Sequence, residues 1–166
     1  MFRKFVTAAA LLFFVTCVAQ AADFSKIPDT TKNIKKGQWV TYKTMGGGTQ
    51  KQTITEVTGS GDDREITFSI EINMGGMALP AQEQKISVKD SKAAQQEAWK
   101  QAPNTTITEG KTNANGKDYD VVIVETVQDG SGVKIYMSEQ VPVTGIVKME
   151  IAGMPEPIMV VDSFGE

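Results

Sequence analysis

The sequence predicts a mainly β domain, a strongly curved antiparallel meander of about nine strands with a single helix. Short segments of strand-like composition are separated by glycine-rich turns such as Gly46-Gly47-Gly48 and Met74-Gly75-Gly76-Met77, and paired glycines reach the positive φ values of hairpin turns. Residues 65–73 alternate apolar and polar side chains, which is typical of an antiparallel strand with one buried face. A sheet this long is expected to curl. The predicted fold is a half-open barrel with the helix packed on or in its concave face.

Four strands are expected before the helix, at residues 38–45, 51–58 and 65–73 and in a long segment that ends at Lys89 with Ile86 and Val88 inward. The helix is expected over residues 92–102, capped by Asp90 or Ser91 and ended by Pro103. Five strands should follow, at residues 105–111, 119–127, 133–138, 146–151 and 158–163. Two of them are apolar on both faces, at 121–124 and 158–161, which indicates that the sheet is covered on both sides there.

The N-terminal residues have the pattern of a secretory signal. Arg3 and Lys4 precede an apolar run over residues 5–18, and Ala19-Gln20-Ala21 supplies a signal-peptidase site, so cleavage is expected before Ala22. The run is shorter than the roughly 20 residues that span a bilayer, and no membrane span is expected after cleavage. We therefore predict a signal peptide at 1–21, a loosely packed leader at 22–36 and one domain at 37–166, in the periplasm or secreted.

Composition excludes several function classes. The chain has 17 basic and 20 acidic residues, and the signal contains two of the basic ones, so the mature chain has a net charge of −5. Its sole arginine is Arg64, which argues against nucleic-acid binding. There is no histidine, and the only cysteine, Cys17, leaves with the signal. The Ser-His-Asp and Cys-His mechanisms and the usual zinc sites are thereby excluded, and we predict a protein that is not an enzyme, without cofactor or metal.

Methionine is frequent, and its use allows three interpretations. Met149 and Met159 lie within predicted strands and are expected to fill the core. Thioethers also form adaptable linings for hydrophobic ligands. Copper(I) favours thioether ligands as well, and the spacing of Met74 and Met77 leaves a copper site open as a weaker alternative.

The layout as a whole resembles that of a known family. A Gly-x-Trp strand entry at Gly37-Gln38-Trp39, a nine-strand meander, one helix and an N-terminal signal together resemble the periplasmic lipoprotein carriers. That resemblance covers residues 37–165 and implies an unclosed β-barrel with helical lids over a hydrophobic cavity for acyl chains. Residues 136–150, with 162–165, also resemble the C-terminal halves of small uncharacterised exported bacterial proteins. No functional residue of the carriers can be carried over, because their buried arginine has no counterpart and Arg64 lies at a turn–strand junction.

We therefore expect a non-enzymatic binding protein of the cell envelope whose ligand is hydrophobic, a lipid or an acyl chain. Residues of the concave face, Ile66 among them, would line the ligand site, with Trp99 near its opening. The predicted ligand-binding residues are Phe68, Ile70, Ile72, Trp99, Ile135 and Met137. The alternative is a structural or protein-interaction module of the envelope, with a filled core, no small-molecule ligand and a protein partner.

Overall fold

The computed structural model describes residues 22–101, 104–128 and 131–166, so the predicted signal peptide lies outside the described residues. Two short 3-10 helices, η1 (Phe24–Lys26) and η2 (Gly61–Asp63), accompany one α-helix, α1 (Val88–Gln101). The strands are β1 (Trp39–Thr44), β2 (Gly48–Thr58), β3 (Glu65–Met74), β4 (Met77–Ala78), β5 (Gln82–Ser87), β6 (Thr105–Ala114), β7 (Lys117–Gln128), β8 (Ser131–Met137), β9 (Ile146–Ile151) and β10 (Met159–Gly165).

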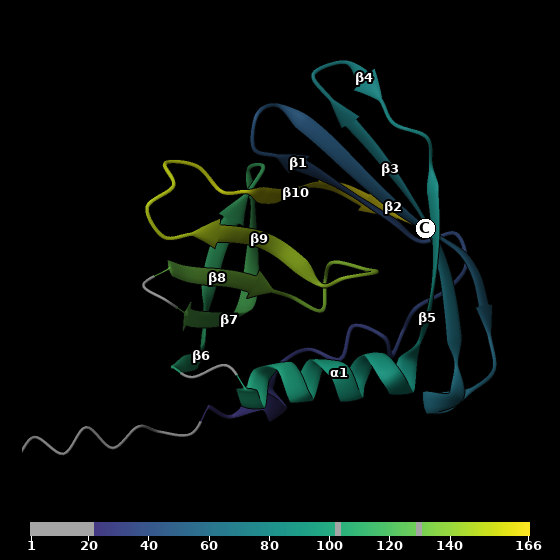
Figure 1. Ribbon diagram of the computed structural model, residues 1–166, viewed down its shortest axis with the longest axis horizontal. Coiled ribbons are helices and arrows are strands. Elements are labelled where there is room, and N and C mark those ends of the chain that lie inside the picture. The colour runs from purple at the N-terminus through teal and green to yellow at the C-terminus, as the bar shows by residue number, and fades with distance from the viewer. Residues whose placement is uncertain (1–21, 102–103, 129–130) are drawn as a thin grey trace, which may run out of the picture.

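The described strands form one antiparallel sheet that does not close. Their order is β4-β3-β2-β1-β10-β9-β8-β7-β6, and β5 pairs with β3 on the same side as β4. The sheet bends into an arch, and α1 runs across its open side from β5 at one edge to β6 at the other (Figure 1). The predicted fold class, a curved antiparallel meander with one helix, is confirmed.

The strand expected before the helix differs from the prediction, because it is divided into β4 and β5. Ala78 pairs with Asn73, and Gln82 pairs with Ile70. Three residues lie between Ala78 and Gln82, whereas two lie between Ile70 and Asn73, so the edge contains one extra residue. Pro80 lies in that interval, and proline is tolerated at edge strands and bulges because it has no N–H for the ladder.

The helix also begins earlier than expected, at Val88 instead of Lys92. The Oγ of Ser87 accepts a hydrogen bond from the backbone N–H of Asp90, 3.3 Å away. Ser87 is therefore the N-cap, and the prediction of Asp90 or Ser91 as the cap was wrong. Val88 is fully buried in one cluster with Ile54 and Ile66 of the sheet, so it has the inward-facing side chain expected of a strand residue although it begins the helix.

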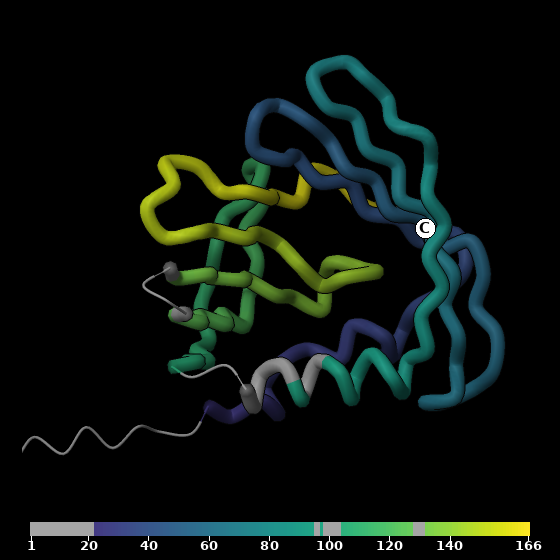
Figure 2. The backbone as a smooth tube through the Cα atoms, viewed as in Figure 1, coloured from purple at the N-terminus to yellow at the C-terminus, as the bar shows by residue number. Residues whose placement is uncertain are grey.

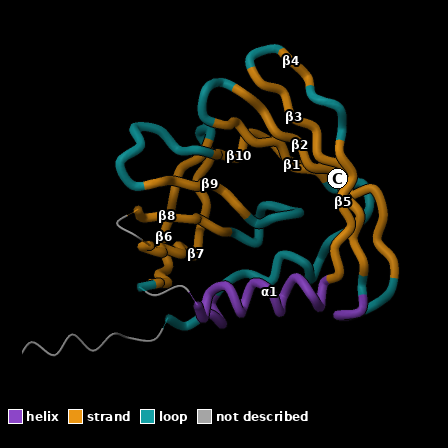
Figure 3. Tube along the Cα trace, in the orientation of Figure 1, coloured by secondary structure: helices purple, strands orange, loops and turns teal. Residues whose placement is uncertain are grey.

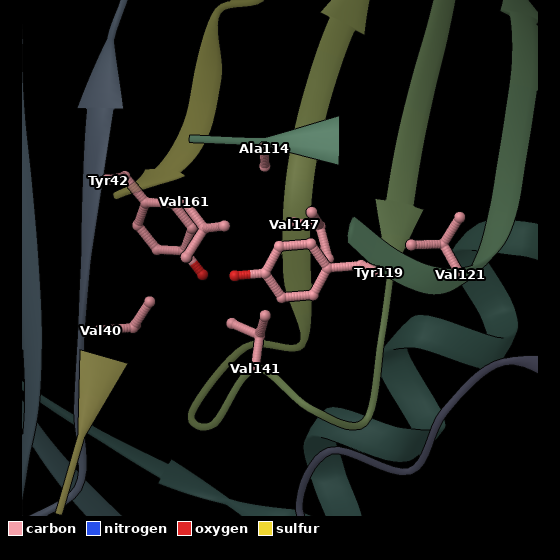
Figure 4. Packing of buried hydrophobic residues seen from close by; sticks show 8 residues of the cluster. All are labelled: Val40, Tyr42, Ala114, Tyr119, Val121, Val141, Val147 and Val161. Carbon is pink, nitrogen blue, oxygen red and sulfur yellow. The ribbon is translucent and has the colours of Figure 1, made fainter. Parts of the chain in front are cut away.

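Two clusters of buried side chains form the core. The first joins β1, β6, β7, β9, β10 and the loop between β8 and β9, and in it the rings of Tyr42 and Tyr119 point toward each other (Figure 4). Its buried members are Val40, Tyr42, Ala114, Tyr119, Val121, Val141, Val147 and Val161. The second lies where the leader and α1 meet the other half of the sheet, and its buried members are Ile34, Ile54, Ile66 and Val88.

The loop between β8 and β9, residues 138–145, connects these clusters. It projects toward the inside of the arch (Figure 3), where Val141 is 1% exposed and Val143 packs against both clusters. Val143 has φ of +70°, a left-handed conformation that is strained for a β-branched residue. The side chain of Thr144 hydrogen-bonds the hydroxyl of Tyr42. This loop therefore fills the centre of the arch from within.

The leader packs along α1 (Figure 2). The amine of Lys92 on α1 lies 3.0 Å from Asp29 of the leader and 2.8 Å from Asp62 of η2. These contacts, with Ile34 in the second cluster, attach the leader to the helix and the sheet. The boundary proposed at residue 36 stays a prediction.

Replacing Gly145 by alanine should destabilise the loop. Gly145 has φ of +71°, and a Cβ there would lie 2.2 Å from Cγ2 of Thr30. The left-handed conformation alone costs about 1–2 kcal/mol for a residue with a Cβ, and the clash adds to it. We expect Gly145→Ala to lower the free energy of unfolding in urea by more than 2 kcal/mol.

Gly153→Ala is the matched control, because Gly153 has φ of +85° with open space around its Cα. This control should show only the conformational cost, about 1 kcal/mol. Equal losses in the two variants would mean that the leader does not pack against the loop at Gly145.

Candidate functional site: the inner face of β3

An apolar row follows β3 on the side of the sheet that faces α1. Ile66 is fully buried in the second cluster, which contains Val88 of α1. Alternate residues of a strand share a face, so Phe68, Ile70, Ile72 and Met74 lie on the same side. Met77 of β4 pairs directly with Met74 across the turn. We call Ile66, Phe68, Ile70, Ile72, Met74 and Met77 the inner row.

Exposure increases along the inner row from one end to the other. Phe68, Ile70 and Ile72 are half-buried, whereas Met74 is 59% exposed and Met77 is 69% exposed. Phe68 still packs against the second cluster. The inner row is thus a continuous apolar surface that begins in the core and ends in solvent at the β3–β4 turn.

Glutamine side chains flank the inner row on both sides. On β2, Gln52 pairs with Ile70 and Gln50 pairs with Ile72. On β5, Gln82 pairs with Ile70 and Gln84 pairs with Phe68. Among the described residues, none of these four side-chain amides makes a hydrogen bond. The amides are therefore available to a bound molecule.

Charge separates between the two faces of this part of the sheet. The register places only uncharged residues on the inner face of β2, β3 and β5, namely Gln50, Gln52, Ile54, Val57, Ile66, Phe68, Ile70, Ile72, Met74, Gln82, Gln84 and Ile86. The charged residues of these strands face outward, namely Lys51, Glu56, Glu65, Glu71, Glu83 and Lys85. The inner face is apolar and amide-bearing, without ions.

The structure brings three of the six predicted ligand-binding residues together and separates the others from them. Phe68, Ile70 and Ile72 are consecutive in the inner row. Ile135 and Met137 lie on β8, and β2, β1, β10 and β9 separate that strand from β3. The backbone of Trp99 belongs to α1, but its side chain lies outside the described residues. The six therefore do not form one lining in the described part, and the ligand site stays a prediction.

Met137 lines a different site, a pocket of about 550 Å³ between the leader and strands β6 to β8. Lys26 of the leader forms an ion pair with Glu109 of β6 there, at 3.0 Å. Asp120 and Glu139 also line this pocket. Its wall is therefore charged, and the inner row is the better surface for an uncharged molecule.

The flanking glutamines were missed by sequence reasoning, although a signal was present. In Gln50-Lys51-Gln52 and Gln82-Glu83-Gln84-Lys85, uncharged and charged residues alternate with a period of two. Such alternation puts the glutamines on one face and the ions on the other. Hydrophobic periodicity alone does not show this pattern, because glutamine is polar and reads as a solvent-facing residue.

A carboxylate cluster lines a pocket of about 360 Å³ beside β8 and β9, where Glu125 and Glu150 both reach the wall. Glu125 is paired with Lys134 at 3.1 Å and Glu150 with Lys148 at 2.9 Å. The hydroxyl of Tyr136 donates to Glu150 at 2.8 Å. Burial acts to raise the pKa of Glu150, but the hydrogen bonds from Lys148 and Tyr136 outweigh it and hold the pKa below its usual value. A carboxyl group that acts as a general acid near neutral pH needs a raised pKa, so Glu150 is not suited to that role.

Within the described residues, no group of three histidine, cysteine, aspartate or glutamate side chains is arranged to hold a metal ion. Met74 and Met77 are register partners across a two-residue turn, and a copper(I) site at this pair stays an open prediction. None of the helices in the described part is long and apolar enough to cross a membrane.

Comparisons with known proteins support the fold and leave the function open. No family model and no curated protein matches the chain. Among solved structures, the chain is similar to a Bacteroides fragilis protein of YmcC-like fold for which export is inferred, with a TM-score of 0.51 and 9% identity. The match covers 80% of this chain and 97% of the other. This neighbour supports, for the fold alone, the resemblance to small exported bacterial proteins, and the resemblance to lipoprotein carriers stays a prediction.

Tyr136→Phe tests the carboxylate cluster. Because the pKa of Glu150 is lowered in the folded state, its interactions stabilise the protein above about pH 4.5 and are lost as the pH falls through the folded-state pKa. Loss of the Tyr136 hydrogen bond should lower the free energy of unfolding by about 1 kcal/mol at pH 7. The deficit should shrink at pH 3.5, as measured by urea unfolding at both values.

Tyr119→Phe is the control, because the Tyr119 hydroxyl makes no hydrogen bond within the described part of the chain. Its effect should be the same at both pH values. A Tyr136→Phe deficit that persists undiminished at pH 3.5 would rule out the assigned role of Glu150.

Proposed function

We propose that this protein is an exported, non-enzymatic binding protein for a hydrophobic ligand, a lipid or an acyl chain, which lies along the inner row of β3. The observation that carries the proposal is the row itself, an apolar surface that leads from the core to solvent, with no charged residue on the same face of β2, β3 or β5. Without a ligand, the half-buried Ile70 and Ile72 and the exposed Met74 and Met77 are in contact with water.

The physical gain from a bound chain is the removal of this surface from water. Burial of apolar surface contributes roughly 25 cal/mol per Å², and no ion has to be desolvated on the inner face. The row from Ile66 to Met74 extends about 27 Å at a rise of about 3.4 Å per residue. A bilayer core of about 30 Å is filled by two acyl chains end to end, so one extended chain fits along the row.

Export and the absence of catalysis are parts of the same proposal. Export is supported by the signal pattern of residues 1–21 and by a neighbour of the same fold for which export is inferred. A non-enzymatic role is supported by the lack of histidine in the chain and by the ion pairs that occupy Glu125 and Glu150.

A second candidate is the protein-interaction module of the envelope, and one observation favours it. The loop over residues 138–145 fills the centre of the arch with Val141 and Val143. In addition, Met45, Met74 and Met77 are exposed at the adjacent β1–β2 and β3–β4 turns. A protein partner would then contact these turns, and the inner row would bind no small molecule.

Ile70→Lys should abolish ligand binding. The substitution places a charge in the middle of the inner row, where a bound acyl chain would have to bury it without a partner. Native mass spectrometry of the mature protein purified from the periplasm should show lipid-sized adducts on the wild type, and the variant should show none. Ser69→Lys, one residue away on the outer face, is the matched control and should retain the adducts.

Circular dichroism should confirm that both lysine variants are folded before their adducts are compared. A wild type that carries no adduct and gains none from added fatty acid, acylglycerol or phospholipid would exclude the ligand-binding proposal. That result would favour the interaction module.

A further inference from the structure

We infer that the ligand is an uncharged amphiphile, whose polar part consists of hydroxyl, ester or amide groups and is recognised by the glutamines beside the inner row. The inference rests on the proposed function, since it names the chemical class of molecule that the inner row would take. It excludes fatty-acid anions and lipids whose phosphate would contact this face.

The register places the amides where they can contact both sides of one bound chain. Gln52 and Gln82 are the direct partners of Ile70 on its two neighbouring strands. Adjacent strands lie about 4.8 Å apart, so the Cα atoms of Gln52 and Gln82, on either side of β3, are roughly 10 Å apart. Gln50 beside Ile72 and Gln84 beside Phe68 repeat the arrangement on a diagonal. The result is an apolar centre with an amide border on each side.

The chemistry of this border favours neutral polar groups. Each glutamine amide offers two N–H donors and a carbonyl acceptor, which suits a hydroxyl, an ester or an amide. An anion on this face would lose its water without meeting a cation, and an unpaired buried charge is strongly unfavourable.

The lysines of the two flanking strands do not supply that cation. Lys51 and Lys85 belong to the flanking strands but face outward. The amine of Lys85 lies 2.7 Å from Glu65, and the amine of Lys51 lies 5.3 Å from the centre of the Trp39 ring. Both lysines are engaged on the opposite face of the sheet.

Contact with water alone does not explain why the residues that flank the inner row are uncharged glutamines. A strand face that only meets water accepts ions, as the outer face of the same three strands shows with Glu56, Glu71 and Glu83. Gln82 and Gln84 are exposed, as are their sequence neighbours Glu83 and Lys85 on the outer face. The inner positions nevertheless hold only amide and apolar side chains. The difference between the faces therefore points to a molecule on the inner one.

The experiment compares monopalmitoylglycerol with palmitate at pH 8, where palmitate is ionised, by calorimetric titration of the mature protein. We expect the acylglycerol to bind at least tenfold more tightly. Gln52→Leu/Gln82→Leu should weaken acylglycerol binding about tenfold, as expected for the loss of two neutral hydrogen bonds. Thr53→Leu/Glu83→Leu, the neighbouring outer-face pair, is the matched control and should leave it unchanged.

Gln52→Lys places a cation on the inner face and should increase the affinity for palmitate at least fivefold. A misfolded variant would not show such an increase. Equal wild-type affinities for palmitate and monopalmitoylglycerol, or an unaffected double leucine variant, would overturn the inference while leaving the proposed function standing. Absence of binding for both lipids to the wild type would overturn the proposed function together with the inference.

Discussion

The packing of one loop inside an unclosed sheet is the interaction on which the rest of the molecule depends. Because β5 and β6 are edges that do not meet, hydrogen bonding alone cannot fix the curvature of the arch. Val143 contacts both core clusters, and Thr144 is tied to Tyr42 on β1. The strain of Val143 at φ of +70° persists because these contacts hold the residue between the two halves of the sheet.

The loop also divides the inner face into two regions of different character. Next to it, Val40 and Tyr42 of β1 are fully buried and serve packing. Beyond the glutamines of β2, the residues of β3 become progressively more exposed. The inner face thus combines a buried half with a more exposed half whose strand residues are uncharged, and this combination is what supports the proposed binding of an uncharged ligand.

The fold was predictable because its signals are local. Glycine-rich turns and the alternation at residues 65–73 gave the meander, and the boundaries of the strand at Ile146–Ile151 agree with the structure. The division at Pro80 and the start of α1 at Val88 depend on tertiary contacts, since Val88 is buried by residues distant in sequence.

The candidate site was predictable only in part. Phe68, Ile70 and Ile72 share a face by periodicity, but the distance between β3 and β8 depends on the strand order, which no local pattern specifies.

The position of β1 and β10 at the middle of the sheet has a consequence for the timing of folding. Trp39 pairs with Gly165, so residues from nearly opposite ends of the chain form the central hydrogen-bonded ladder. Val161 of β10 and Val40 of β1 belong to the same core cluster, which therefore cannot assemble until β10 has been synthesised. Topologies dominated by such distant pairings fold slowly. For the export that we propose, such a delay is an advantage, because a chain that crosses a membrane in extended form must not fold before it has passed.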